Sequence, residues 1–302
     1  MSSPPTPTPV WLITATSSGF GKQIALEALS RGHRVIATAR DSSKLTLLRS
    51  LGAAVLDLDV TADQAVLDAK LAQAAAVYGR LTHVVNAAGY IFVGAVEEAS
   101  QQEERDVYAT NVFGVLRMAR AATPWLREAA KEGGIVSLVN FGSLGSYNSG
   151  PGVGHYCSTK GAVSSISEGL AAELRPFGIE VCCVEPGYTR TEFLRKGDGG
   201  KERRVVARRE MEVYGEEGHP VREWKDAMDA VDGRQPGDVE RAARVIVDVL
   251  TKEGVARGRD IPVRLPLGSD TIKQIRKRIG EYEARVREWE DVARLVDYES
   301  EF

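Results

Sequence analysis

Short apolar runs alternate with stretches in which apolar residues recur at spacings of three and four. The runs predict buried parallel strands at residues 10–14, 35–39, 53–59, 81–88, 134–141, 179–184 and 261–267. The spacings predict helices at about 20–30, 42–50, 61–78, 102–130 (interrupted near Pro124), 154–175 and 236–250. This alternation is typical of an α/β fold with a doubly wound parallel sheet and right-handed crossovers.

Three segments break the alternation. Residues 1–9 (MSSPPTPTP) predict a disordered or extended lead-in to a single domain at 10–268. Residues 188–233 form a long, charged segment that is poor in strand signal, which is typical of a lid. The arginines of its basic cluster (201–209) are predicted to lie on a solvated helix face, with an anion site as the alternative. Residues 269–302 predict a long helical extension with an apolar stripe, which needs the domain body or another subunit to cover it.

Composition narrows the classes of function. The chain has 302 residues, is 43% hydrophobic and 27% charged, and carries a net charge of −3. This balance gives no reason to expect nucleic acid or an anionic membrane as a partner, and no apolar run has the length of a membrane span. Cys157, Cys182 and Cys183 lack metal-ligand spacing, so we expect reduced thiols, no metal site and a cytoplasmic setting.

A turn rich in Gly and Ser, TATSSGFG from Thr14 to Gly21, joins the first predicted strand to the first helix. In a βαβ unit, a dinucleotide pyrophosphate meets backbone N–H groups and a helix N-terminus at this point. Glycine suits the turn because it lets backbone approach phosphate, whereas Ala15 adds a Cβ. The turn predicts dinucleotide binding, and an ordinary tight turn is the alternative.

Arg40 ends the second predicted strand and follows Ala39 rather than an acid. An Asp or Glu here bonds the ribose 2′-OH of NAD, whereas Arg accommodates the 2′-phosphate of NADP. Asp41 lies one position late, so NADP(H) is favoured over NAD(H). Asp59 closes the third strand, where its carboxylate either reaches the adenine half of the cofactor or forms an Asx-turn.

Tyr156 and Lys160 stand four apart on a predicted helix and share one face. A phenol has a pKa near 10, and an ammonium held beside it pulls that pKa toward neutrality. Ser143 lies at the end of the fifth strand, so the three side chains could converge on one substrate oxygen. Asn111 lies inside a helix, where Asn costs propensity and often has another task.

Together these motifs resemble the compact type of the short-chain dehydrogenase/reductase family. The family's T-G-x-x-x-G-x-G turn is matched by TATSSGFG except at Ala15, and its N-N-A-G by NAAG at 86–89 except at Ala87. Its catalytic Asn, Ser, Tyr and Lys fall on Asn111, Ser143, Tyr156 and Lys160, and its Pro-Gly after strand six falls on Pro186 and Gly187. The match is strong over residues 10–188.

The resemblance implies a Rossmann-type, mostly parallel seven-stranded sheet of order 3-2-1-4-5-6-7 with helices on both faces. It implies an NADP(H)-dependent oxidoreductase that transfers a hydride between the nicotinamide and a ketone or secondary alcohol. Of the two directions it favours reduction, as in a carbonyl reductase. Tyr156 would be the general acid, Lys160 would lower its pKa and bind the nicotinamide ribose, and Ser143 would polarise the substrate oxygen. Asn111 would hold a water that links Lys160 to solvent.

The resemblance also implies a set of cofactor contacts. They are Thr14, Ser17, Gly19, Phe20, Gly21, Arg40, Asp59, Val60, Asn86, Gly89, Tyr156, Lys160, Pro186, Gly187 and Thr189. Compact members usually pair through the helices that carry Asn111 and Tyr156, which implies a homodimer or homotetramer.

Two other functions compete with this interpretation. A non-catalytic nucleotide-binding or scaffold protein could retain the fold, and Ala15 is the feature in its favour. A sugar-nucleotide epimerase or dehydratase would carry a G-x-x-G-x-x-G turn and a larger C-terminal domain, and TATSSGFG has the other spacing.

Overall fold

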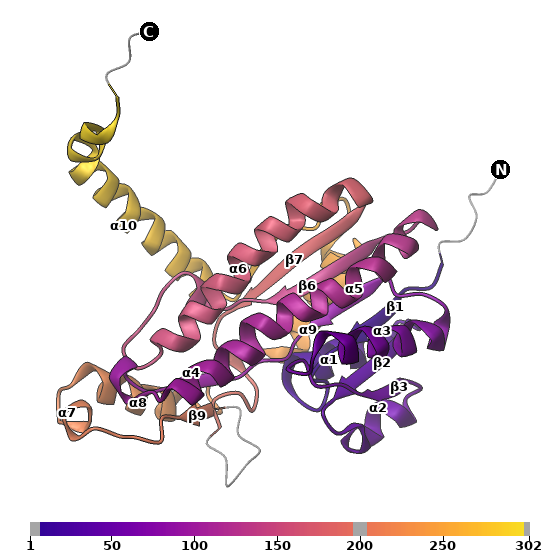
Figure 1. The fold of residues 1–302 in the computed structure, drawn as a ribbon, viewed down its shortest axis with the longest axis horizontal. Coiled ribbons are helices and arrows are strands. Elements are labelled where there is room, and N and C mark those ends of the chain that lie inside the picture. Colours follow the sequence, from indigo (N-terminus) through magenta and orange to yellow (C-terminus); the bar gives the residue numbers. More distant parts are fainter. Residues whose placement is uncertain (1–6, 196–203, 299–302) are drawn as a thin grey trace.

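The computed structural model describes residues 7–195 and 204–298, and its centre is one parallel sheet (Figure 1). The strand order is β11-β7-β6-β4-β1-β2-β3, and every neighbouring pair is parallel. The strands are β1 (Val10–Ile13), β2 (Arg34–Ala39), β3 (Ala54–Asp57), β4 (His83–Asn86), β6 (Val136–Phe141), β7 (Ile179–Pro186) and β11 (Arg264–Leu267). The predicted fold class and strand order are confirmed.

Helices cover both faces of the sheet because successive strand side chains point to opposite sides. On β1, Trp11 and Ile13 pack with the face that carries α1 (Gly19–Ser30) and α9 (Val239–Thr251). Val10 and Leu12 pack with the face that carries α3, α5 and α6. The other helices are α2 (Thr46–Ser50), α3 (Gln64–Tyr78), α4 (Gln101–Tyr108), α5 (Gly114–Lys131), α6 (Gly154–Leu174), α7 (Glu212–Gly215), α8 (Pro220–Val231) and α10 (Ser269–Ala293).

The long helix predicted at 102–130 is interrupted at a different place. α5 continues through Pro124, so the prediction of a break there is wrong. Buried Met118, Ala122 and Leu126 pack α5 against the sheet, and this packing outweighs the loss of one backbone donor. The irregular turn is instead a π-helical segment, Ala109–Phe113, between α4 and α5. Such π-turns occur most often at functional sites.

The described parts of the segment 188–233, residues 188–195 and 204–233, contain strands that its sequence did not predict. β9 (Arg204–Val206) pairs with β5 (Ile91–Val93), and β8 (Thr189–Arg190) pairs with β10 (Gly237–Asp238); these strands are too short for periodicity to reveal. Arg204 is buried and ion-paired with Asp229, so the expected solvated helix face is wrong at this residue. Residues 201–203 of the basic cluster lie outside the described residues.

The predicted C-terminal helix is confirmed as α10, whose distal half extends away from the domain (Figure 1). Ile279, Tyr282, Val286 and Trp289 are exposed along it, so the domain body does not cover this part of the stripe. Residues 1–6 of the predicted lead-in lie outside the described residues. None of the helices in the described ranges is long and apolar enough to cross a membrane.

Candidate active site

A cavity of about 350 Å³ opens where β1, β4, β6 and β7 end. Carboxyl ends of parallel strands are the usual place for a ligand in such a sheet. Its walls come from the glycine turn, the loop after β6, the start of α6, the chain after β7, and α8. The predicted site residues on its wall are Gly19, Phe20, Gly21, Gly89, Ser143, Tyr156, Lys160, Pro186, Gly187 and Thr189.

The glycine turn presents the N-terminus of α1 to this cavity. Ser18 precedes the helix without a side-chain cap bond, so the first backbone N–H groups remain available for an anion. A Cβ on Gly21 would lie 2.7 Å from the Thr14 carbonyl oxygen, which leaves room only for glycine. These features fit the pyrophosphate of a dinucleotide, although Ala15 adopts φ +55°, a left-handed conformation that disfavours a Cβ.

Thr14 shapes the turn from behind. Its hydroxyl oxygen accepts hydrogen bonds from the backbone N–H groups of Ala87 (2.9 Å) and Ala88 (3.1 Å) and lies 3.2 Å from the Val85 carbonyl oxygen. The residue is buried, at 1% exposure, and does not line the cavity. Thr14 therefore ties the turn to the end of β4.

Tyr156 and Lys160 lie near the start of α6, one turn apart, and both are buried. Burial raises the pKa of Tyr156, and a hydrogen bond with the Ser143 side chain lowers it in part. Burial lowers the pKa of Lys160 to about 8. Lys160 Nζ donates to the Phe141 carbonyl (2.8 Å) and lies 5.8 Å from the Tyr156 ring centroid. The predicted trio is thus assembled, with Ser143 the closer polar partner of the phenol.

Asn111 lies on the π-turn, and its amide is held on both sides. Nδ2 donates to the Tyr90 carbonyl (2.9 Å) and to Thr159 Oγ1 (3.1 Å), while Oδ1 accepts from the Tyr90 N–H (3.1 Å). A Cβ on Gly89 would meet Asn111 Oδ1 at 3.2 Å and Lys160 Nζ at 3.5 Å. Asn111 and Lys160 therefore converge on Gly89, where a Cβ would be in tight contact with the Asn111 amide.

Of the residues predicted for the 2′-phosphate and the adenine half, Gly89 lines the cavity wall and the other five lie apart from it. Arg40 is exposed at the end of β2, and Asp41 beside it is engaged with Ser43 and Lys44. The Asp59 carboxylate accepts from Thr61, so of its two predicted roles the structure shows the Asx-turn. Val60 packs on Gly114, and Asn86 Nδ2 donates a hydrogen bond to Asn140. Ser17 lines a neighbouring hollow.

An apolar wall of the cavity was not predicted. Phe193, Leu194, Trp224 and Met228 line it, and all four come from the segment 188–233. The Phe193 ring lies 5.9 Å from the ring of Tyr156. The length and charge of this segment predicted a lid, but the apolar residues within it carry no motif that would single them out.

This fold, with a glycine turn and a Ser–Tyr–Lys group in one cavity, defines a Rossmann-type dinucleotide-dependent enzyme. The family model for short chain dehydrogenases matches residues 9–200. The chain belongs to this family and is an oxidoreductase of the short-chain type that acts on CH–OH or C=O groups of small molecules.

Three relatives show how far the likeness extends. The chain is 32% identical to Oxidoreductase calM of Penicillium decumbens over 94% of this chain and 91% of that protein. It is 30% identical to the uncharacterized oxidoreductase YusZ of Bacillus subtilis over 85% of this chain and 88% of that protein. The crystal structure of a short-chain dehydrogenase from Streptomyces avermitilis superposes with a TM-score of 0.82 at 36% identity, covering 97% of this chain and 100% of that one. Solved structures that share the fold at 20–23% identity hold NADH, NAD or NADP.

Proposed function

We propose that the protein is an NADP(H)-dependent reductase of apolar ketones. The observation that carries the proposal is a single cavity in which Tyr156, Ser143 and Lys160 face an apolar wall. The uncapped N-terminus of α1 supports a dinucleotide at the other end of the cavity. An apolar wall with a few polar groups at one point suits a ligand that is oriented through one oxygen.

The proton chemistry belongs to Tyr156. In the direction of reduction its hydroxyl gives a proton to the substrate oxygen, and Ser143 donates a hydrogen bond that polarises the same oxygen. Charged Lys160 favours the phenolate that remains, because an opposite charge nearby stabilises it. Asn111 holds a water beside Gly89 through which Lys160 exchanges protons with solvent. A bound nicotinamide supplies or accepts the hydride.

Arg40 supports NADP(H) as the preferred cofactor. Its guanidinium is exposed at the end of β2, where it suits a 2′-phosphate. The neighbouring Asp41 carboxylate is already bonded to Ser43 and Lys44, so it competes poorly for a ribose 2′-OH. Asp59, Val60, Asn86 and Gly89 flank the adenine half in this proposal.

The remaining features complete the proposal. Residues 188–233 act as the substrate lid of the domain at 10–268, because they supply the apolar wall beside Tyr156. The subunits pair through the helices that carry Asn111 and Tyr156, as a homodimer or homotetramer. Cys157, Cys182 and Cys183 are free thiols, which suits a reducing, cytoplasmic compartment.

A screen for NADPH consumption over apolar and polar ketones tests the function. We expect turnover of apolar ketones, and we expect Tyr156→Phe to abolish it while NADPH still quenches protein fluorescence. Retained turnover in Tyr156→Phe would refute the proton-transfer role. NADPH binding without turnover of any carbonyl would favour the non-catalytic alternative.

A further inference from the structure

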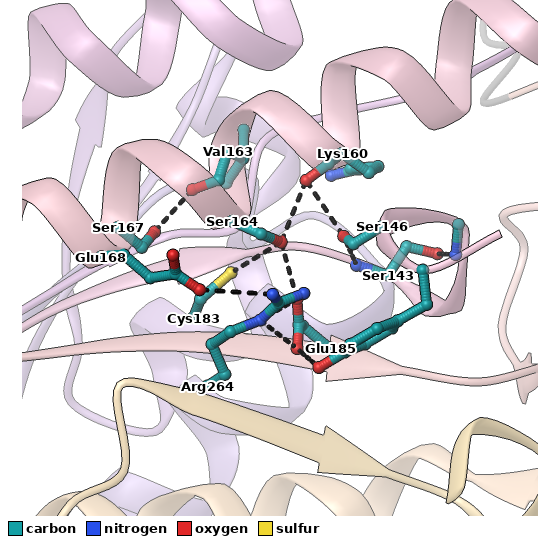
Figure 2. Close-up of polar contacts among 12 residues, drawn as sticks. Ser143, Ser146, Lys160, Val163, Ser164, Ser167, Glu168, Cys183, Glu185 and Arg264 are labelled. Atoms are coloured by element: carbon teal, nitrogen blue, oxygen red, sulfur yellow. Dashed lines mark hydrogen bonds and ion pairs between the residues drawn. The ribbon is translucent and has the colours of Figure 1, made fainter. Parts of the chain in front are cut away.

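A buried carboxylate lies behind the catalytic residues. Glu185, on β7, is 0% exposed. Arg264 of β11 donates to it from Nε (3.1 Å to each oxygen) and from Nη2 (2.6 Å), the Tyr147 hydroxyl donates to Oε2, and Ser164 Oγ lies 2.6 Å from Oε1 (Figure 2). A buried charge needs this number of partners, because an unpaired one is costly.

These contacts connect Glu185 to both ends of the loop that carries Ser143. At one end, a Cβ on Gly142 would lie 2.8 Å from Glu185 Cγ, so the two residues are in contact. At the other end, Tyr147 is held through its hydroxyl, while its carbonyl accepts from Arg278 of α10 (3.0 Å).

The same contacts reach the helix that carries Lys160. Ser146 Oγ accepts from the Ser143 N–H (3.1 Å) and donates to the Lys160 carbonyl (3.0 Å), and both links are visible in Figure 2. Ser164, one turn further along α6, lies within hydrogen-bond distance of Glu185 and of that carbonyl. Glu185 therefore lies between the Ser143 loop and the Lys160 turn.

We propose that Glu185, oriented by Arg264, is a positioning residue that fixes the loop 142–147 against α6 and so sets the spacing between Ser143 and Tyr156. This inference rests on the proposed function. Stability alone does not explain the ion pair, because apolar residues of similar volume often replace such pairs at no loss. A fixed spacing does explain it, since bidentate bonds impose direction as well as contact.

Glu185→Gln and the milder Tyr147→Phe test the proposal. Because small misplacements of catalytic groups cost up to about 100-fold in rate, we expect kcat for carbonyl reduction to fall about 10- to 100-fold in Glu185→Gln and several-fold in Tyr147→Phe. We expect an unchanged Kd for NADPH and faster hydrogen exchange at the amides of residues 143–147. Asp248→Asn is the matched control, because it breaks a buried ion pair with Arg31 (2.8 Å) remote from the cavity.

The outcomes separate positioning from stability. The double variant Glu185→Gln/Arg264→Met regains thermal stability but neither kcat nor exchange protection if the pair positions the loop. Unchanged exchange in Glu185→Gln, or a kcat loss no larger than that of Asp248→Asn, overturns the proposal. Hydrogen exchange does not depend on turnover, so it decides the question even where the wild type reduces no carbonyl and the proposed function fails.

A second, independent observation concerns α10. Apolar residues occupy every first and fourth position of three successive heptads: Ile272, Ile275, Ile279, Tyr282, Val286 and Trp289. Near its start α10 contacts the domain through Gln274, half-buried Ile275 and Arg278, whereas the stripe from Ile279 to Trp289 is exposed. Three sustained heptads of this kind are the pattern of a coiled-coil seam.

The charges that flank the seam indicate its partner. Arg278 and Arg285 occupy the positions before the first apolar residue of a heptad, and Glu283 and Glu290 those after the second. Two parallel copies place Arg285 opposite Glu290 of the neighbouring helix, whereas antiparallel copies oppose like charges. Arg278, at the equivalent position one heptad earlier, is already held by the Tyr147 carbonyl and Glu281 of its own chain. We infer that α10 forms a parallel two-stranded coiled coil with a second copy of this chain.

Sedimentation of the full chain and cysteine cross-linking test this inference. Val286→Lys places a charge in the seam. Because the proposed pairing through the helices that carry Asn111 and Tyr156 holds two subunits together by itself, we expect Val286→Lys to halve the mass of a tetramer, and Glu288→Lys on the outer face to leave the mass unchanged. In a parallel coil Val286 meets its own copy, so Val286→Cys is expected to form an interchain disulfide far faster than Glu288→Cys. Equal cross-linking of the two cysteine variants overturns the inference.

Discussion

Replacing Ala15 by glycine is expected to stabilise the fold and tighten dinucleotide binding. Ala15 has φ +55°, and a left-handed conformation costs a residue with a Cβ about 1–2 kcal/mol. The glycine variant has a more flexible unfolded chain, and this offsets about 0.4–1 kcal/mol of the gain. The net gain is therefore about 1 kcal/mol, which for a chain of 302 residues raises Tm by roughly 1.5 °C. Ala15 also lines the cavity, so we expect a lower Kd for NADPH.

Differential scanning fluorimetry and fluorescence titration with NADPH measure the two effects. Lys252→Gly is the matched control, because Lys252 is the other described non-glycine residue with positive φ (+54°) and lies at the C-terminus of α9, off the cavity wall. It is expected to raise Tm without changing the Kd. A lower Tm for Ala15→Gly would refute the strain, and an unchanged Kd would refute contact between Ala15 and the cofactor.

Three further predictions follow from charge. Arg40→Asp removes charge-assisted hydrogen bonds to the 2′-phosphate of NADPH, which are worth about 1.5–3 kcal/mol. The ratio of KM for NADPH to KM for NADH is therefore expected to rise at least about 10-fold, and an unchanged ratio contradicts the 2′-phosphate role. Burial lowers the pKa of Lys160 to about 8, so the charge of its ammonium group is present below this pH and lost above it. We therefore expect kcat/KM for reduction to fall above about pH 8, and a pH profile that is flat to pH 10 would contradict this. Burial lowers the pKa of His83 to about 3, so between about pH 6.5 and pH 3 the folded state binds fewer protons than the unfolded state. The free energy of unfolding therefore falls as the pH drops through this range, by roughly 5 kcal/mol at most. Urea unfolding at pH 7 and pH 4 is expected to show a smaller loss in His83→Gln than in the wild type, and equal losses would exclude His83 as the cause.

The sheet could be predicted from sequence because its strands are buried on both faces. Runs such as residues 10–14 and 179–184 are apolar throughout, and only a covered parallel strand needs this pattern. The short strands β5 and β9 were not predicted, since a run of three residues such as Ile91–Val93 is too short to distinguish a strand even where it is apolar. The π-turn at Ala109–Phe113 was also beyond prediction, because it differs from an α-helix by one residue per turn and leaves no compositional trace.

The candidate site divides in the same way. Ser143, Tyr156 and Lys160 were predictable because their chemistry requires these residue types at strand ends and one helical turn apart. Phe193 and Trp224 were not, because an apolar side chain in a charged segment has the same appearance whether it packs on its own helix or lines a cavity. Glu185 was missed for a related reason: its partners Tyr147 and Arg264 lie 38 and 79 positions away in sequence, so only the fold brings them together.

This division has a consequence for how the active site is built. In the proposed mechanism the groups that move the proton lie on α6 and on the loop after β6. Hydrogen bonds join these parts, since Ser146 Oγ donates to the Lys160 carbonyl and Lys160 Nζ donates to the Phe141 carbonyl at the end of β6. The groups that would contact the rest of the substrate lie on the segment 188–233, whose described part joins the domain through the β5–β9 strand pair, the Lys225–Glu98 ion pair and buried apolar contacts of Leu194 and Met228. Under the proposed function, substitutions of the partly buried Phe193 and Trp224 are expected to change which substrate fits at a smaller cost in folding free energy than substitutions around Lys160, which disturb buried hydrogen bonds. The proposal therefore places the choice of substrate and the proton-transfer step on different parts of the chain.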